Sequence, residues 1–181
     1  MSILFKSKPL TLILLAIYLI SLFWIIVLKF NISAYHDGVE RSMNWIPFPS
    51  LFGLSGQGDL NESLLNIFIF IPFGLYVGIL GENWPIGQKL ILFFVTSFIF
   101  EISQYLFKYG AFDATDLVNN TAGGVVGFLI FAGLEKRLGE NKRALHIINL
   151  LGLVGTVLVL SFLFYLKLNH LWIFRMELIQ R

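Results

Sequence analysis

Carboxylate and amide side chains interrupt the apolar stretches of this sequence, and they are the residues best suited to chemistry. Glu101 and Gln104 are three residues apart, so they share one face of a helix. Asp116 and Asn120 are four apart and share a face in a second stretch, and Asn66 begins a third. A charge in the middle of a membrane span costs at least about 2.5 kcal/mol on insertion scales, so these side chains need a reason to be there.

Two kinds of chemistry suit this set. In a binding site, Glu101 is the charged anchor, and Gln104, Asn120 and Asn66 supply directional hydrogen bonds to a hydroxyl, amide or amine group. In a membrane-embedded enzyme acting on a lipid or lipid-linked sugar, Glu101 and Asp116 are the acid–base pair. We favour binding without catalysis, because the sequence has no recognisable Ser–His–Asp set, no metal-ligand spacing and no nucleophile beside a base.

Structural roles are open for the same residues. Asp113 and Asp116 suit the capping of a helix start, because they are three residues apart at the beginning of an apolar stretch. Asn66 also suits a helix start, and Asn120 suits a single hydrogen bond between helices. Glu101 would in that case pair with a neighbouring helix or with Gln104.

The composition identifies the scaffold that must position these residues. The 181-residue chain is 57% hydrophobic and 13% charged, with a mean hydropathy of +0.80. Soluble domains carry about 25% charged residues, which excludes a soluble enzyme, a disordered chain and a disulfide scaffold. The net charge of +2 indicates no nucleic-acid partner, and the absence of cysteine excludes thiolate chemistry. We predict an all-α, polytopic membrane helix bundle without cofactor or metal.

Five segments have the roughly 20 apolar residues that a membrane helix needs. They are residues 10–28, 63–81, 90–107, 116–134 and 144–166. Basic residues at 6–8 and at 135–143 are separated by an even number of spans, so the positive-inside rule predicts a cytoplasmic amino terminus. We divide the chain into an anchor helix and flank (1–36), a central domain (37–134) and a last helix with an interfacial tail (135–181).

This topology brings the polar residues of three helices to one depth. Glu101 is about six residues, or roughly 9 Å, from the outer end of its span, and Asn120 about four residues, or roughly 6 Å. Asn66 is in the first turn of its span. The sequence therefore predicts a polar pocket that opens to the outside. The small-residue pairs Gly74/Gly78 and Gly123/Gly127 predict close helix contact beside it.

Arg41 is the one Lys or Arg in the long outer loop at 31–62. Because the pocket contains two carboxylates, we hypothesise that Arg41 pairs with Glu101 or Asp116. An interfacial position against lipid headgroups is an equal alternative.

Four blocks of residues, in this order, resemble the VanZ-like family of bacterial membrane proteins between about residues 41 and 134. The blocks are Arg41-x-x-Asn44-x-x-Pro47-Phe48, Asn66-x-x-x-Phe70-x-Pro72-Phe73-Gly74, Glu101-x-x-Gln104 and Phe112-Asp113-x-x-Asp116-x-x-x-Asn120-Thr121-x-Gly123-x-x-x-Gly127. The resemblance implies a multi-pass protein of the cell membrane associated with low-level resistance to teicoplanin-type glycopeptides. For the predicted polar pocket, we expect a membrane lipid, a lipid-linked cell-wall precursor or the glycopeptide as partner, and the oligomeric state is left open. Ala111 stands where many members have Arg, which removes a counter-charge.

Overall fold

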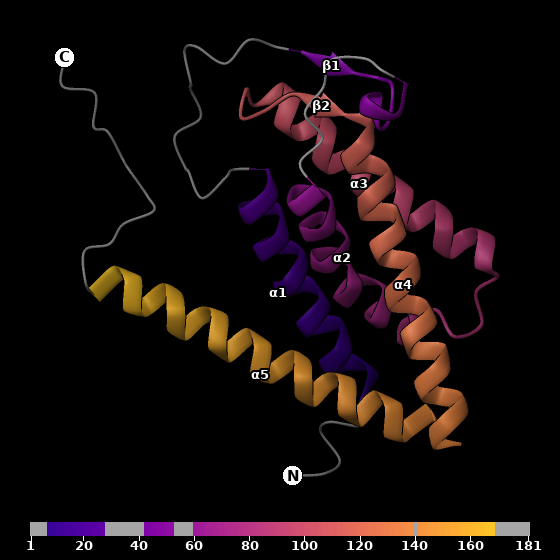
Figure 1. Ribbon diagram of the computed structural model, residues 1–181. Helices are drawn as coiled ribbons and strands as arrows, with labels where there is room; N and C mark the ends of the chain where they lie inside the picture. Colours follow the sequence, from indigo (N-terminus) through magenta and orange to yellow (C-terminus); the bar gives the residue numbers. More distant parts are fainter. Residues whose placement is uncertain (1–6, 28–41, 53–59, 140, 169–181) are drawn as a thin grey trace.

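A computed structural model describes residues 7–27, 42–52, 60–139 and 141–168 and shows a helical bundle (Figure 1). Five of the helices in this part of the chain are long and apolar enough to cross a membrane. They are α1 (Lys8–Ile26), α2 (Leu60–Leu80), α3 (Ile86–Leu106), α4 (Ala114–Leu138) and α5 (Asn141–Leu168). The predicted fold class, an all-α bundle of about five membrane helices, is confirmed, with one small addition of strand described below.

Contacts between the helices fix their relative directions. Lys8 Nζ lies 2.9 Å from Glu82 Oε2, which brings the start of α1 to the turn after α2. Gln104 Nε2 donates to the carbonyl of Ile26 at 2.8 Å, which brings the ends of α1 and α3 together. The helices α1 and α3 therefore run in one direction, and α2 and α4 run in the other, as four alternating membrane spans require.

The α2–α4 interface is the most extensive in the bundle, and glycine makes it possible. A methyl group added at Gly74 would lie 2.8 Å from the Cα of Gly127, and one added at Gly123 would lie 2.8 Å from the Cβ of Phe70. Both are too short for real contacts, so the two backbones touch at these positions. The predicted close approach is confirmed for Gly74, Gly123 and Gly127, whereas Gly78 accommodates the ring of Phe131 instead.

Some helix boundaries differ from those predicted. The third helix begins at Ile86, three residues before Lys89, because Pro85 is the N-cap and its fixed φ suits a helix start. Lys89 is therefore a residue of α3. Its side chain is buried, and its ammonium lies 4.4 Å from the ring centroid of Phe128 on α4. The fourth helix extends to Leu138, so the basic residues Lys136 and Arg137 form its last turn, where cations complement the helix dipole.

One other boundary differs, and one predicted segment is not tested. The second helix begins at Leu60, so Asn66 lies in its second turn and not its first. The interfacial tail was predicted from residue 167 onward, and residues 169–181 lie outside the described part of the chain.

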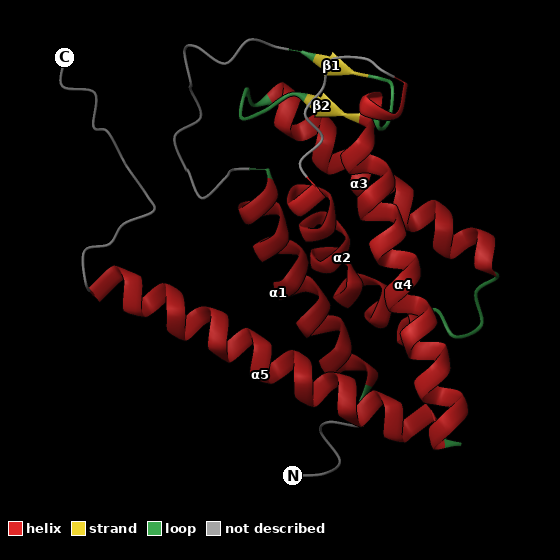
Figure 2. Ribbon diagram, viewed as in Figure 1, coloured by secondary structure: helices red, strands yellow, loops and turns green. Residues whose placement is uncertain are grey.

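One end of the bundle carries a short pair of parallel strands that was not predicted (Figure 2). Strand β1 (Met43–Asn44) pairs with β2 (Phe112–Asp113), in the register Met43 to Phe112. A 3₁₀ turn, η2 (Pro49–Phe52), follows β1. Residues 42–52, which we name the cap, therefore lie against the start of α4 (Figure 1).

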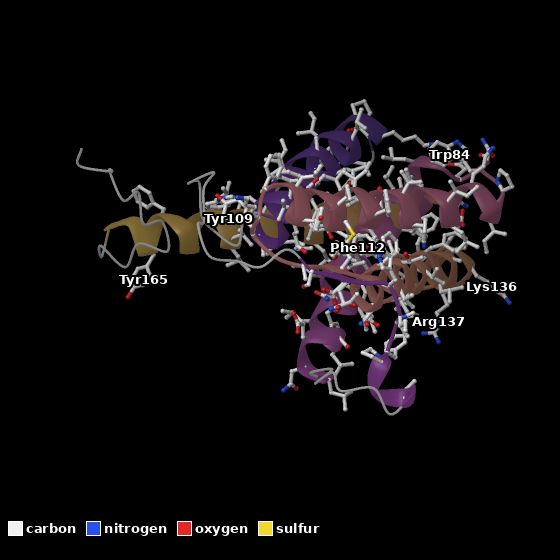
Figure 3. All side chains as sticks on the ribbon, turned by 90° about the horizontal axis from the view of Figure 1, so that it is seen from above. Trp84, Tyr109, Phe112, Lys136, Arg137 and Tyr165 are labelled. Atoms are coloured by element: carbon white, nitrogen blue, oxygen red, sulfur yellow. The ribbon has the colours of Figure 1, made fainter. Side chains whose placement is uncertain are left out.

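The last helix, α5, is attached by its first half. Its buried residues Leu145 and Ile148 pack into a core with Leu14 and Tyr76. In Figure 1, its carboxyl-terminal half extends away from the other helices. Figure 3 shows the same for Tyr165, which lies on α5 well away from the bundle.

Candidate functional site

The predicted site residues of α2 and α4 are in direct contact. Asn66 Nδ2 donates to Asp116 Oδ1 at 2.6 Å. Both side chains are short, and the bond is possible because the glycines described above bring the two backbones close together. Asn66 therefore acts as a partner of Asp116 across the interface.

Asp113 links α4 to α3. Its side chain caps α4, because Asp113 Oδ1 accepts from the N–H of Thr115 at 2.7 Å. Its own backbone N–H donates to Glu101 Oε2 at 3.2 Å. The capping role predicted for Asp113 is confirmed. Glu101 is almost completely buried, with 1% of its surface exposed, so this carboxylate faces the interior of the bundle.

Buried polar atoms without a partner lie about one helical turn further along α3 and α4 from these two contacts. They are Ser97 Oγ, Asn119 Nδ2 and Asn120 Oδ1, and none has a hydrogen-bond partner among the described residues. Gly124 packs against Phe93, and Asp113 reaches Glu101, so α3 and α4 run in opposite directions. Ser97 is four residues from Phe93 and Asn120 is four residues before Gly124, so both lie on the facing sides of these helices.

These residues form one group toward one end of three helices, the end at which the cap lies. We name it the polar cluster, and its members are Asn66, Ser97, Glu101, Asp113, Asp116, Asn119 and Asn120. An unsatisfied buried donor or acceptor costs about 1–3 kcal/mol. The cluster contains carboxylate acceptors, an amide donor, an amide acceptor and a hydroxyl group that can donate and accept.

Of the two other predicted site residues, Gln104 has a different role and Arg41 is not described. Gln104 is buried, but its amide is used to bind the carbonyl of Ile26, so it attaches α1 to the end of α3. Arg41 lies outside the described residues, and its predicted pairing with Glu101 or Asp116 stays a prediction.

The cap contributes residues that were not predicted to belong to the site. Asn44 Nδ2 donates to Asp113 Oδ2 at 3.3 Å, and the N–H of Phe48 donates to Thr115 Oγ1 at 3.1 Å. Phe48 lies between two prolines with a positive φ of 52°, a conformation that is costly for a residue with a side chain. The signal in the sequence was the block Arg41-x-x-Asn44-x-x-Pro47-Phe48 of the family resemblance, and no periodic pattern links these residues to α4.

Outside the membrane spans, one side chain of this end of the bundle has a shifted pKa. Tyr109, in the turn between α3 and β2, is buried, and burial raises the pKa of its phenol. This side chain is therefore neutral. Within residues 7–27, 42–52, 60–139 and 141–168, no three His, Asp or Glu side chains are close enough to hold a metal ion.

Five apolar helices, with the carboxyl group of Glu101 and several amides buried between them, define a helical membrane protein. The family model described as VanZ/LLP1 matches residues 15–135, and the chain belongs to this family. The chain is similar to Protein VanZ of Enterococcus faecium, with 33% identity over 159 residues, 87% of this chain and 94% of that protein. No solved structure matches it. The predicted family resemblance is therefore confirmed.

Proposed function

We propose that this protein contributes to low-level resistance to teicoplanin-type glycopeptides as a multi-pass protein of the bacterial cell membrane. It does so by binding an envelope lipid, a lipid-linked cell-wall precursor or the drug at the polar cluster. The family supplies the link to the antibiotic. The observation that supports binding is the set of buried polar atoms without a partner beside the buried carboxylate of Glu101.

The chemistry of the cluster favours a ligand with hydroxyl or amide groups. Asn119 Nδ2 offers a donor, Asn120 Oδ1 an acceptor, and Ser97 Oγ can act as either. A ligand group that pairs with them recovers the free energy that the empty hydrogen-bond positions cost. Glu101 and Asp116 add acceptors that suit a hydroxyl or amine better than a bare phosphate.

The distribution of basic residues supports an outward-facing cluster. Lys8 begins α1, Lys136 and Arg137 end α4, and Arg143 lies in the first turn of α5. The direction of the helices puts all four at the end of the bundle opposite the polar cluster. Because basic residues favour the cytoplasmic side, this end faces the cytoplasm in our proposal and the cluster faces outward.

The test is the teicoplanin susceptibility of cells that produce wild type, Glu101→Gln, Asn120→Leu or Glu62→Gln, at equal membrane levels. Glu101→Gln removes the buried carboxyl group, and Asn120→Leu removes the free acceptor without enlarging the side chain much. Glu62→Gln is the matched control, because Glu62 is exposed at the start of α2. We expect reduced protection for the first two variants only. Equal protection by all four proteins would disprove a role for the cluster.

A further inference from the structure

The cap has an outer side that is apolar and exposed. Met43, Trp45, Ile46 and Leu51 are 37%, 64%, 50% and 79% exposed. Residues 42–52 contain no charged side chain. A short segment with this composition is unusual for a loop in water, where exposed apolar patches mark interaction sites.

The same segment is also attached to the bundle, partly through the ring of Trp45 itself. The ring of Trp45 lies 4.8 Å from that of Phe112, and the ring of Phe112 lies 6.0 Å from that of Phe98 on α3. Figure 3, seen from above, shows Phe112 over the middle of the helices. The cap is therefore fixed in position, and its exposed side chains are held there by the fold.

The exposed apolar surface of the helices continues to the level of the cap. Leu106 and Phe107, at the end of α3, are exposed, and so are Leu60, Leu64 and Leu65 at the start of α2. Lipid must cover these helix surfaces in a membrane protein, because water would not stabilise them. The cap begins where they end (Figure 1), so its apolar side is a continuation of the lipid-facing surface.

We propose that residues 42–52 are a membrane-interface anchor, which inserts Trp45, Ile46 and Leu51 into the headgroup region of the adjacent leaflet. Trp is enriched at this depth, where an apolar ring and a polar N–H are both accommodated. The partner is the lipid surface itself. This inference goes beyond the proposed function, because it holds whether or not the polar cluster binds a ligand.

The anchor has a consequence for the polar cluster. Asn44 contacts Asp113, and Phe48 contacts Thr115, so the cap lies against the first residues of α4, beside the carboxylate of Asp113. A cap held in the headgroup region separates these groups from bulk water. Molecules that reside in the leaflet then reach the cluster more directly than soluble ones.

The chain has no natural cysteine, which allows a direct test with single-cysteine variants. Leu51→Cys and Ile46→Cys, labelled with an environment-sensitive fluorophore, are reconstituted into vesicles of equal parts phosphatidylcholine and phosphatidylglycerol. Leu158→Cys on the exposed side of α5 is the control for lipid contact, and Lys136→Cys is the control for water. The quenchers are a lipid with a nitroxide near its headgroup, and aqueous iodide.

We expect the nitroxide lipid to cause a loss of emission at positions 51 and 46 comparable with that at position 158, with little loss from iodide. Loss of emission from iodide as large as at position 136 would overturn the proposal. Labels that neither quencher reaches would show that protein, not lipid, covers the cap, and would also overturn it. Because Leu51 is 79% exposed, its replacement removes no internal packing. Susceptibility to teicoplanin is not part of this test, so the two proposals fail independently.

Discussion

Gly123→Ala should separate α2 from α4, and the structure indicates by how much. The added methyl group would lie 2.8 Å from Phe70 Cβ and would overlap the carbonyl of Ile67. Ordinary contacts begin at 3.4 Å, so the interface must open by at least about 0.6 Å. Because the Ile67 carbonyl is backbone, no rotamer change relieves the overlap. Overpacking of this kind costs about 1–3 kcal/mol.

The matched control is Gly133→Ala in the same helix, where an added methyl group meets nothing within 4 Å. Both substitutions improve helix propensity by up to about 1 kcal/mol, so the difference between the variants isolates the packing term. Unfolding in bicelles by titration with dodecyl sulfate, followed by Trp fluorescence, measures this difference. We expect Gly123→Ala to be less stable than Gly133→Ala by about 1–3 kcal/mol. Equal stability would refute the inference that the two backbones touch.

Three other outcomes are expected. Asp113→Ala should destabilise α4 by about 0.5–2 kcal/mol in the same titration, and Asp113→Asn, which keeps an acceptor for the N–H of Thr115, by less. Thr11 Oγ1 donates to Asn149 Oδ1 at 2.9 Å between α1 and α5, so Thr11→Val should cost about 0.6 kcal/mol, and at most about 1.7; an unchanged midpoint would count against this contact. Burial raises the pKa of Tyr109, so the folded state binds that proton more tightly. The protein should therefore lose stability as the pH rises from about 10 through the raised value, and Tyr109→Phe should reduce that loss.

The bundle was predictable because its signals are local. Span length and apolar composition follow from the thickness of the bilayer, so five spans could be placed to within a few residues. Helical periodicity put Asp116 and Asn120 close to the face of Gly123. The structure packs Asp116 and Gly123 against α2, and it buries Asn120 on the neighbouring side that faces α3 with Gly124. The burial of Glu101 followed from the cost of a charge facing lipid.

The parts that were missed depend on contacts between distant segments. The β1–β2 pair joins residues about 69 positions apart, and two residues per strand give no detectable alternation. Lys89 lies just before the span predicted at residues 90–107, because a Lys usually marks the end of an apolar span. Its long side chain is accommodated inside by the face of the Phe128 ring. Ser97 was not predicted to be a site residue, because a single hydroxyl in an apolar helix usually bonds to its own backbone. Ser103 does so with the carbonyl of Ile99.

The glycines of the α2–α4 interface and the polar cluster are parts of one arrangement. Asn66 and Asp116 have short side chains, so their 2.6 Å hydrogen bond forms only if the backbones are close. Glycine at positions 74, 123 and 127 provides that closeness. The longer Glu101 reaches Asp113 from α3, where Phe93 against Gly124 sets the spacing. A larger residue at one of these glycines therefore changes the separation of the polar groups and leaves their chemistry unaltered. A substitution such as Asp116→Asn changes the chemistry and leaves the separation unaltered. The effects of these two kinds of substitution on any bound ligand should not be additive, because both act through the same pair of side chains.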